Sequence, residues 1–152
     1  MILFTGGGKA GSWKCRGEQI GGALGAEVNP LAGLAEFKAA SLVVVVKRVP
    51  DERLHALRAS GTPWVWDAVD PYPQPHASEW TREEAIAWIR HRLNYLKPDA
   101  VIWPNGKMAD DIQWKGHQQV IYHHHRPGIQ VNPIRKDVRV IGYEGSPPYI
   151  EA

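Results

Sequence analysis

The chain has 152 residues, of which 43% are apolar, so it is long enough and hydrophobic enough to form one domain with a single core. Its formal charge of +2, from 18 basic and 16 acidic residues, is too balanced to indicate bulk binding to nucleic acid or to a membrane surface. We therefore expect one domain over residues 1–152, with partners that are not selected by net charge.

Cysteine content and hydropathy narrow the class of protein further. Cys15 is the only cysteine, which excludes an internal disulfide and permits a reducing compartment. The longest apolar run, at 42–46 with its flanks, is far shorter than the ~20 residues of a membrane span. Residues 1–5 are followed directly by glycine and lack the pattern of a secretory leader. We expect a soluble, cytoplasmic protein with no membrane span.

The start of the chain predicts a short strand, a glycine-rich turn and a helix. Residues 1–5 are mostly apolar, and Gly6, Gly7, Gly8 and Gly11 follow. Because glycine has no Cβ atom and tolerates positive φ, backbone amides in this turn could approach a phosphate or a sugar closely. The alternative is a plain tight turn whose glycines serve helix–strand packing.

The same glycines formally match a dinucleotide-binding pattern. Gly6, Gly8 and Gly11 satisfy G-x-G-x-x-G, and Glu27 lies near the position of a ribose-binding acid. We discount the match because residues 12–16 intervene before the helix and a breaker, Asn29-Pro30, follows Val28. An NAD-dependent oxidoreductase rests on this spacing alone, and we expect no cofactor.

Strand and helix patterns then alternate along the chain. A helix over 30–40 would place Leu31, Leu34 and Ala35 on its inner face. A capping box that begins at Thr81 opens the most distinct helix. The other predicted elements are helices at 51–59 and 108–115 and strands at 42–46, 63–66, 100–103, 119–122 and 138–141.

This alternation predicts a three-layer α/β domain with a mostly parallel sheet of about seven strands. In such folds, ligands collect at the carboxyl edge of the sheet, near the switch in strand order. The prediction gathers polar residues from several strand ends along one rim. They are the turn at 6–11, Lys47, Asp67, Asp70, Asn105, His123, His124, His125 and Glu144.

Asp67 and Asp70 are candidate catalytic residues. A carboxylate at a strand end, shielded by Trp64 and Trp66, would have a raised pKa and could accept the proton of an attacking hydroxyl. Alternatively, Asp70 forms a turn before Pro71, and Asp67 caps a helix or loop. The D-x-x-D spacing differs from the D-x-D of metal-dependent nucleotide-sugar sites, so we predict no bound metal.

Three consecutive histidines, His123, His124 and His125, resemble a metal cluster only at first sight. Successive side chains at a strand end alternate in direction, so at most His123 and His125 share a face, and two ligands do not complete a metal site. We predict that these two contact a polar substrate or transfer a proton, with packing histidines as the alternative.

Basic side chains are candidates for binding the substrate. Lys47 and Arg48, together with Lys9, Lys14 and Arg16, could neutralise a phosphate or orient a glycan. The common alternative for such residues is a solvated surface.

Two tryptophans, Trp13 and Trp66, are the best candidates for stacking on a sugar, whereas Trp88, inside a periodic helix, is expected in the core. The loop at 67–80 contains three prolines that stiffen it, and we interpret it as a binding loop. The complete set of predicted substrate-binding residues is Gly6, Gly7, Gly8, Lys9, Ser12, Arg16, Lys47, Trp66, Asn105 and Glu144.

Several stretches across nearly the whole chain carry a family resemblance. They read GSWKCRGEQIGGALGA, VVVVKRVPDE, WDAVDPYPQP, YHHHRPGIQVNPIR and VIGYEGSPPY. In these motifs the chain resembles the Rossmann-like amino-terminal domain of GT-B-type glycosyltransferases, including bacterial and phage-encoded ones.

The resemblance implies a role on the acceptor side of sugar transfer. In that family the amino-terminal domain mainly binds the hydroxyl acceptor and supplies the catalytic base, while a second Rossmann-like domain holds the nucleotide-sugar donor. Catalysis occurs between the two domains without an obligatory metal. Residues 149–152 lie about where the linker to the second domain would begin, so the resemblance implies a missing second domain or a homodimer in its place. We do not expect turnover of a sugar donor by this chain alone.

Two functions from different classes follow. The first is the acceptor-binding half of a glycosyltransferase that acts on a nucleotide sugar and a hydroxyl acceptor. The second is a stand-alone, non-catalytic Rossmann-like module that binds a nucleotide or a protein.

Overall fold

The computed structural model describes residues 1–8, 11–69 and 81–122. The strands are β1 (Ile2–Gly6), β2 (Glu27–Val28), β3 (Leu42–Val46), β4 (Trp64–Asp67), β5 (Ala100–Trp103) and β6 (His117–Val120). The helices are η1 (Trp13–Ile20), which α1 (Gly21–Ala23) continues, α2 (Leu34–Ala39), α3 (Asp51–Ser60), α4 (Arg82–Leu96) and α5 (Gly106–Ile112). The predicted strand at 138–141 lies outside the described residues.

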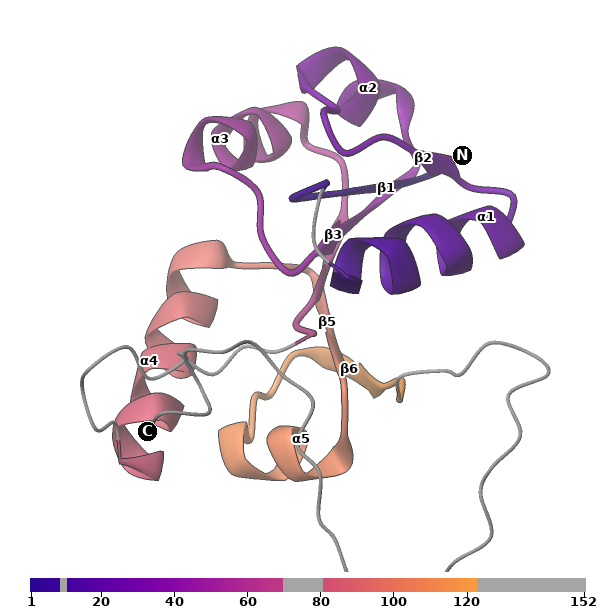
Figure 1. Ribbon diagram of the computed structural model, residues 1–152. Helices are drawn as coiled ribbons and strands as arrows, with labels where there is room; N and C mark the ends of the chain where they lie inside the picture. The colour runs from indigo at the N-terminus through magenta and orange to yellow at the C-terminus, as the bar shows by residue number, and fades with distance from the viewer. Residues whose placement is uncertain (9–10, 70–80, 123–152) are drawn as a thin grey trace, which may run out of the picture.

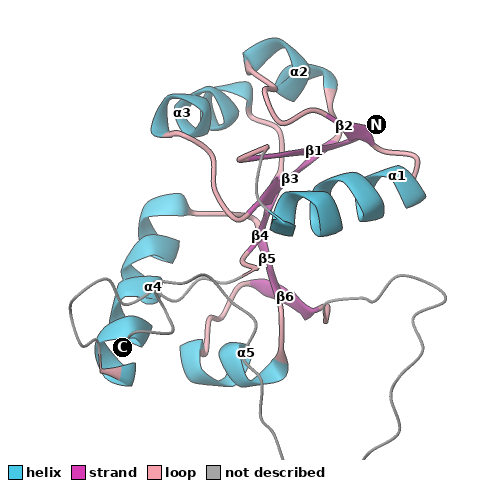
Figure 2. Ribbon diagram, viewed as in Figure 1, coloured by secondary structure: helices cyan, strands magenta, loops and turns pink. Residues whose placement is uncertain are grey.

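All six strands form one parallel sheet in the order β2-β1-β3-β4-β5-β6. The sheet runs from β2 to β6 through the centre of Figure 2. Strand order reverses at β1: the chain steps outward to β2, returns past β1 to β3 and then continues in one direction. The switch point of this Rossmann-like α/β fold therefore lies between the neighbouring strands β1 and β3.

Helices cover the two faces of the sheet unequally. Figure 1 shows α1 on one side of the sheet and α3 and α4 on the other. Alternate residues of each strand supply the two corresponding cores. One core contains Leu3, Val43, Val45, Trp66 and Trp103 and receives residues of α2, α3, α4 and α5, and the second contains Phe4, Val44 and Val46 with Trp13 of η1.

Most of the helices and strands predicted from local sequence patterns are confirmed. Thr81 caps α4 as predicted: its hydroxyl accepts the backbone N–H of Glu84 at 3.2 Å, and the Glu84 carboxylate accepts the N–H of Thr81 at 2.7 Å. Gly61, with φ +71°, ends α3. Strand β6 begins two residues before the predicted 119–122, because it pairs with β5 from His117 onward. Among the helices of the described ranges, none combines the length and the apolar character needed to cross a membrane.

The predicted inner face of the helix at 30–40 is wrong. Leu31 is 81% exposed, Leu34 is 41% exposed and Ala35 is also exposed, whereas Phe37 is buried. The Asn29 side chain accepts the N–H of Leu31 at 2.9 Å and holds a turn before the helix. The helix then begins only at Leu34, where the Glu36 carboxylate accepts the N–H of Gly33 at 3.0 Å. This later start changes which residues face the sheet, and Ala32 and Ala40 flank Phe37 in the core.

Candidate functional site

The carboxyl edge of the sheet brings together two of the regions selected from the sequence. Gly6 of β1 pairs in register with Val46 of β3, and Val46 pairs with Asp67 of β4. Because neighbouring strands lie about 4.8 Å apart, Gly6 and Asp67 are separated by roughly 10 Å along this edge. The glycine turn and the Asp67 carboxyl end therefore belong to one edge, beside the switch point.

Within the glycine turn, the glycines have different roles. A Cβ atom on Gly6 would lie 2.8 Å from the Val46 carbonyl oxygen and 2.9 Å from the Trp13 ring, so Gly6 allows η1 to pack closely on β1 and β3. Gly8 has φ +75°, a conformation that favours glycine. Gly7 is exposed, and a Cβ atom there would meet nothing within 4 Å. The backbone at Gly7 is therefore open to the approach of a ligand.

Arg53 lies at the same edge and was not selected from the sequence. Its guanidinium reaches from the first turn of α3 to the carbonyl oxygens of Gly6, at 3.3 Å, and Pro30. Burial lowers the pKa of the Arg53 guanidinium. Arg53 could have been selected from its position in the first turn of the helix after β3, because the strand order puts this turn beside the switch point.

Arg16 and Asp67 form an ion pair in the second core. Arg16 Nε lies 3.1 Å from Asp67 Oδ2, and both residues are almost completely buried. The other guanidinium nitrogens of Arg16 donate to the carbonyl oxygens of Ile121, at 2.8 Å, and Tyr122, at 3.4 Å. Arg16 was predicted to bind substrate, but its charge is used inside the protein, where it joins η1 to the ends of β4 and β6.

Burial raises the pKa of Asp67 to about 6, against the opposing effect of the Arg16 charge. The raised pKa agrees with the sequence prediction, but the predicted cause is wrong. Trp64 and Trp66 belong to the core on the opposite face of β4, so their rings do not shield Asp67. The Oδ1 atom of Asp67 has no hydrogen-bond partner among the residues described.

The two tryptophans predicted to stack on a sugar are core residues. Trp13 and Trp66 are each 2% exposed. The Trp66 ring packs edge-on against Trp103, with centroids 6.4 Å apart, and its Nε1 donates to the Lys47 carbonyl oxygen at 2.9 Å. Stacking of either ring on a ligand would require the core to open.

Lys47 occupies a strained turn directly after β3. Its φ is +64°, and the N–H of Arg48 donates to the Val46 carbonyl oxygen at 2.8 Å, which closes a three-residue γ-turn. The neighbouring strand holds this turn on both sides, because the Lys47 N–H donates to the Asp67 carbonyl oxygen at 2.9 Å and its own carbonyl accepts from Trp66. Surrounding bonds of this kind are needed for strained backbone to persist.

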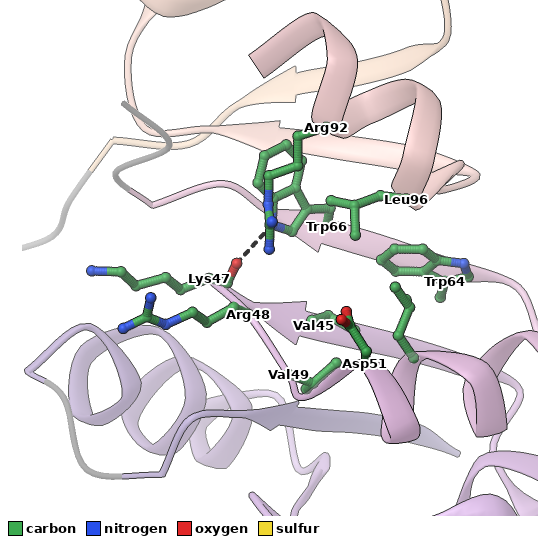
Figure 3. Close-up of a pocket in the computed structure, with 10 residues that line it drawn as sticks. Val45, Lys47, Arg48, Val49, Asp51, Trp64, Trp66, Arg92 and Leu96 are labelled. Carbon is green, nitrogen blue, oxygen red and sulfur yellow. Dashed lines mark hydrogen bonds between the residues drawn. The ribbon is translucent and has the colours of Figure 1, made fainter. Parts of the chain in front are cut away.

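Figure 3 shows the hollow beside this turn, between α3 and α4, with Lys47 and Arg48 extending away from it in the same direction. Arg92 reaches toward the hollow from α4, and its guanidinium lies 5.5 Å from the centre of the Trp88 ring. The volume of the hollow is about 10 Å³. This is the space of roughly one water molecule, so the hollow is too small for a sugar or a nucleotide.

Two of the remaining predicted site residues lie at the starts of helices, and the others lie outside the described residues. Asn105 caps α5, since its side-chain oxygen accepts the N–H of Met108 at 2.9 Å, and Ser12 stands at the N-cap of η1 without a side-chain capping bond. No group of three or more metal-ligating side chains occurs among the described residues. Lys9, Asp70, His123, His125 and Glu144 lie outside the described residues, as does most of the loop at 67–80.

The fold and this edge define the class of the protein: a Rossmann-like α/β domain with a glycine turn and a buried ion pair at the carboxyl edge of a parallel sheet. Comparison of the chain with protein-family models, with curated proteins and with solved structures finds no match.

Proposed function

We propose that this domain is the acceptor-binding half of a GT-B-type glycosyltransferase, which binds a hydroxyl acceptor beside a nucleotide-sugar donor and is inactive without a second domain. One observation carries the proposal. Gly6, Val46 and Asp67 stand in one row at the carboxyl edge, beside the reversal of strand order between β1 and β3. In parallel α/β sheets this is where ligands bind.

The reaction requires a base for the attacking hydroxyl. The acceptor oxygen would form a bond to the anomeric carbon of the donor, the nucleoside diphosphate would leave, and a basic side chain would take the hydroxyl proton. Asp67 is ionised at neutral pH, because its pKa is about 6, but it is only 3% exposed and paired with Arg16. Asp70, His123 and His125 remain the other predicted candidates for this base.

The second candidate function is a stand-alone module that binds a nucleotide or a protein without catalysis. The burial and ion pairing of Asp67 favour this second function. This carboxylate is the one predicted catalytic residue within the described ranges, and it is buried and ion-paired. Its main contribution there is to the structure of the edge.

Thermal-shift measurements test both candidates. The ligands are UDP-, GDP- and ADP-sugars, the bare nucleotides, and a panel of sugar and other hydroxyl acceptors. The proposed function predicts a rise in Tm with an acceptor or a nucleotide sugar, because a ligand that binds only the folded state stabilises it. A rise with bare nucleotides that is no larger with nucleotide sugars would favour the nucleotide-binding module. No rise with any ligand would contradict both the acceptor-binding function and a nucleotide-binding module.

A matched pair of glycine variants locates the ligand. A Cβ atom at Gly7 or at Gly22 would meet nothing within 4 Å, so Gly7→Ala and Gly22→Ala both leave the packing intact. Gly22 lies in α1, outside the glycine turn. The ligand-induced rise in Tm should fall in Gly7→Ala and persist in Gly22→Ala.

A further inference from the structure

The carboxyl end of β1, beside the switch point, holds a cation in a defined position. Arg53 donates to the carbonyl oxygens of Gly6 and Pro30, so its guanidinium is fixed where the glycine turn leaves the sheet. A guanidinium has five N–H groups. The two hydrogen bonds leave further donors of Arg53 for another acceptor.

The charge of Arg53 is not neutralised by these contacts. Carbonyl oxygens satisfy hydrogen bonds but carry no net charge, and within the described part of the chain no carboxylate forms an ion pair with Arg53. Two carboxylates precede it in α3, Asp51 and Glu52, and both are exposed. Partial burial of the guanidinium lowers its pKa, which is the effect of desolvating a charge without an opposite charge beside it.

The glycine turn supplies hydrogen-bond donors beside Arg53. Across residues 1–8, 11–69 and 81–122, no backbone carbonyl accepts the amide of Gly7 or Gly8. Gly7 is exposed and has open space where a side chain would be, and the positive φ of Gly8 redirects the chain at this point. Successive amides in such a turn form a concave site for anions.

We propose that Arg53, together with the backbone amides of Gly7 and Gly8, binds a phosphate group at the switch point. Arginine suits this role because its planar fork can donate two parallel hydrogen bonds to phosphate oxygens. The bonds to Gly6 and Pro30 hold the fork in place before the ligand arrives, which reduces the ordering cost of binding. The inference rests on the proposed function only for the source of the phosphate, the diphosphate of a nucleotide sugar.

Isothermal titration calorimetry with inorganic phosphate, pyrophosphate and UDP tests the site. The wild-type chain should bind pyrophosphate and UDP. Arg53→Gln should weaken both by roughly 10- to 100-fold, the value expected for losing a charged hydrogen-bond donor. Gly7→Ala should weaken both because the added methyl group would occupy the approach to the amides.

Arg58→Gln is the matched control. Arg58 lies on the same helix and also donates to carbonyl oxygens, those of Tyr95 and Leu96, but it stands in the last turn of α3. Its replacement should leave the affinity unchanged. If Arg53→Gln lowers the Tm, the affinity is measured instead with Gly7→Ala and Arg53→Lys. Arg53→Lys keeps the positive charge but loses the planar fork of the guanidinium.

The outcomes separate the two proposals. Absence of pyrophosphate binding, or equal binding by the wild-type chain, Arg53→Gln and Gly7→Ala, would overturn the phosphate site. Pyrophosphate binding that depends on Arg53, without binding of any nucleotide sugar or acceptor, would support the site and contradict the proposed function. Nucleotide-sugar binding that neither substitution weakens would retain the function and reject the site.

Discussion

Arg16 and Asp67 form an ion pair inside the protein, with Arg16 Nε 3.1 Å from Asp67 Oδ2, and the same guanidinium binds the carbonyl oxygens of Ile121 and Tyr122. One side chain thus connects the first helix, the end of β4 and the end of β6. Since buried charges are costly unless they are paired, this arrangement makes the carboxyl edge dependent on both members of the pair.

Replacing Arg16 should destabilise the protein strongly. Arg16→Met retains much of the side-chain volume but leaves Asp67 buried without its partner, either as an unpaired charge or as a carboxyl group that must take up a proton. We expect a loss of roughly 3–5 kcal/mol in the free energy of unfolding. Urea denaturation at pH 7 measures it. Arg90→Met is the control, because Arg90 is exposed and donates to the carbonyl oxygens of Asp111 and Ile112, and its loss should cost about 1 kcal/mol. Equal losses of unfolding free energy in the two variants would show that the buried ion pair contributes no more to stability than the exposed Arg90.

Asp67 should make stability decrease as the pH rises from about 4 to about 6. Its pKa is about 6 in the folded protein and ~3.9 in an unfolded chain, so between these values only the folded state holds the proton. Stability contributed by this group is therefore present at low pH, is lost as the pH rises, and is constant above about 6.

The measurement is the difference in free energy of unfolding between the wild-type chain and Asp67→Asn, from urea titrations at pH 4, 5, 6 and 7. The subtraction removes the titration of other groups. The wild-type advantage should fall by roughly 2 kcal/mol across this range. A difference that is flat or that increases with pH would mean that Asp67 does not have a raised pKa.

Adjacent glycines in the turn should respond differently to alanine. At Gly6 the new Cβ atom would lie 2.8 Å from the Val46 carbonyl oxygen and 2.9 Å from the Trp13 ring, so Gly6→Ala should cost about 1–3 kcal/mol by overpacking. At Gly7 the space is open, and Gly7→Ala should change stability by less than about 0.5 kcal/mol. Thermal unfolding followed by circular dichroism compares them. A large loss in Gly7→Ala would contradict the open space at that position.

Lys97 ends α4 in the left-handed region, with φ +51°, a conformation that a lysine adopts at a cost. Lys97→Gly should therefore stabilise the protein by about 0.5–1 kcal/mol. Lys38→Gly is the control of opposite sign, since Lys38 is an exposed residue of α2 and glycine there should cost about 0.5–1 kcal/mol. Denaturant midpoints at constant m-value give both numbers. If both variants lose stability, the helix end is not strained.

Local patterns explain which elements could be predicted. The run at 42–46 became β3 because continuous β-branched residues suit a strand that is buried on both faces, and α4 began at Thr81 because the capping bonds join residues three apart. The inner face of α2 could not be predicted in the same way. It depended on whether the turn at Asn29 would delay the helix, and the sequence pattern permitted either start.

The sequence by itself determined that strands and helices alternate, and therefore that the protein is an α/β domain with a parallel sheet, because these features follow from periodicity and capping over short stretches. Only the tertiary structure decided how individual site residues are used. Strand order brings Arg16 to Asp67 and to Ile121, buries Trp13 and Trp66, and places Arg53 at the glycine turn. A charge or a ring has the same sequence signature in a core and in a binding site, and its partners across the sheet decide between them.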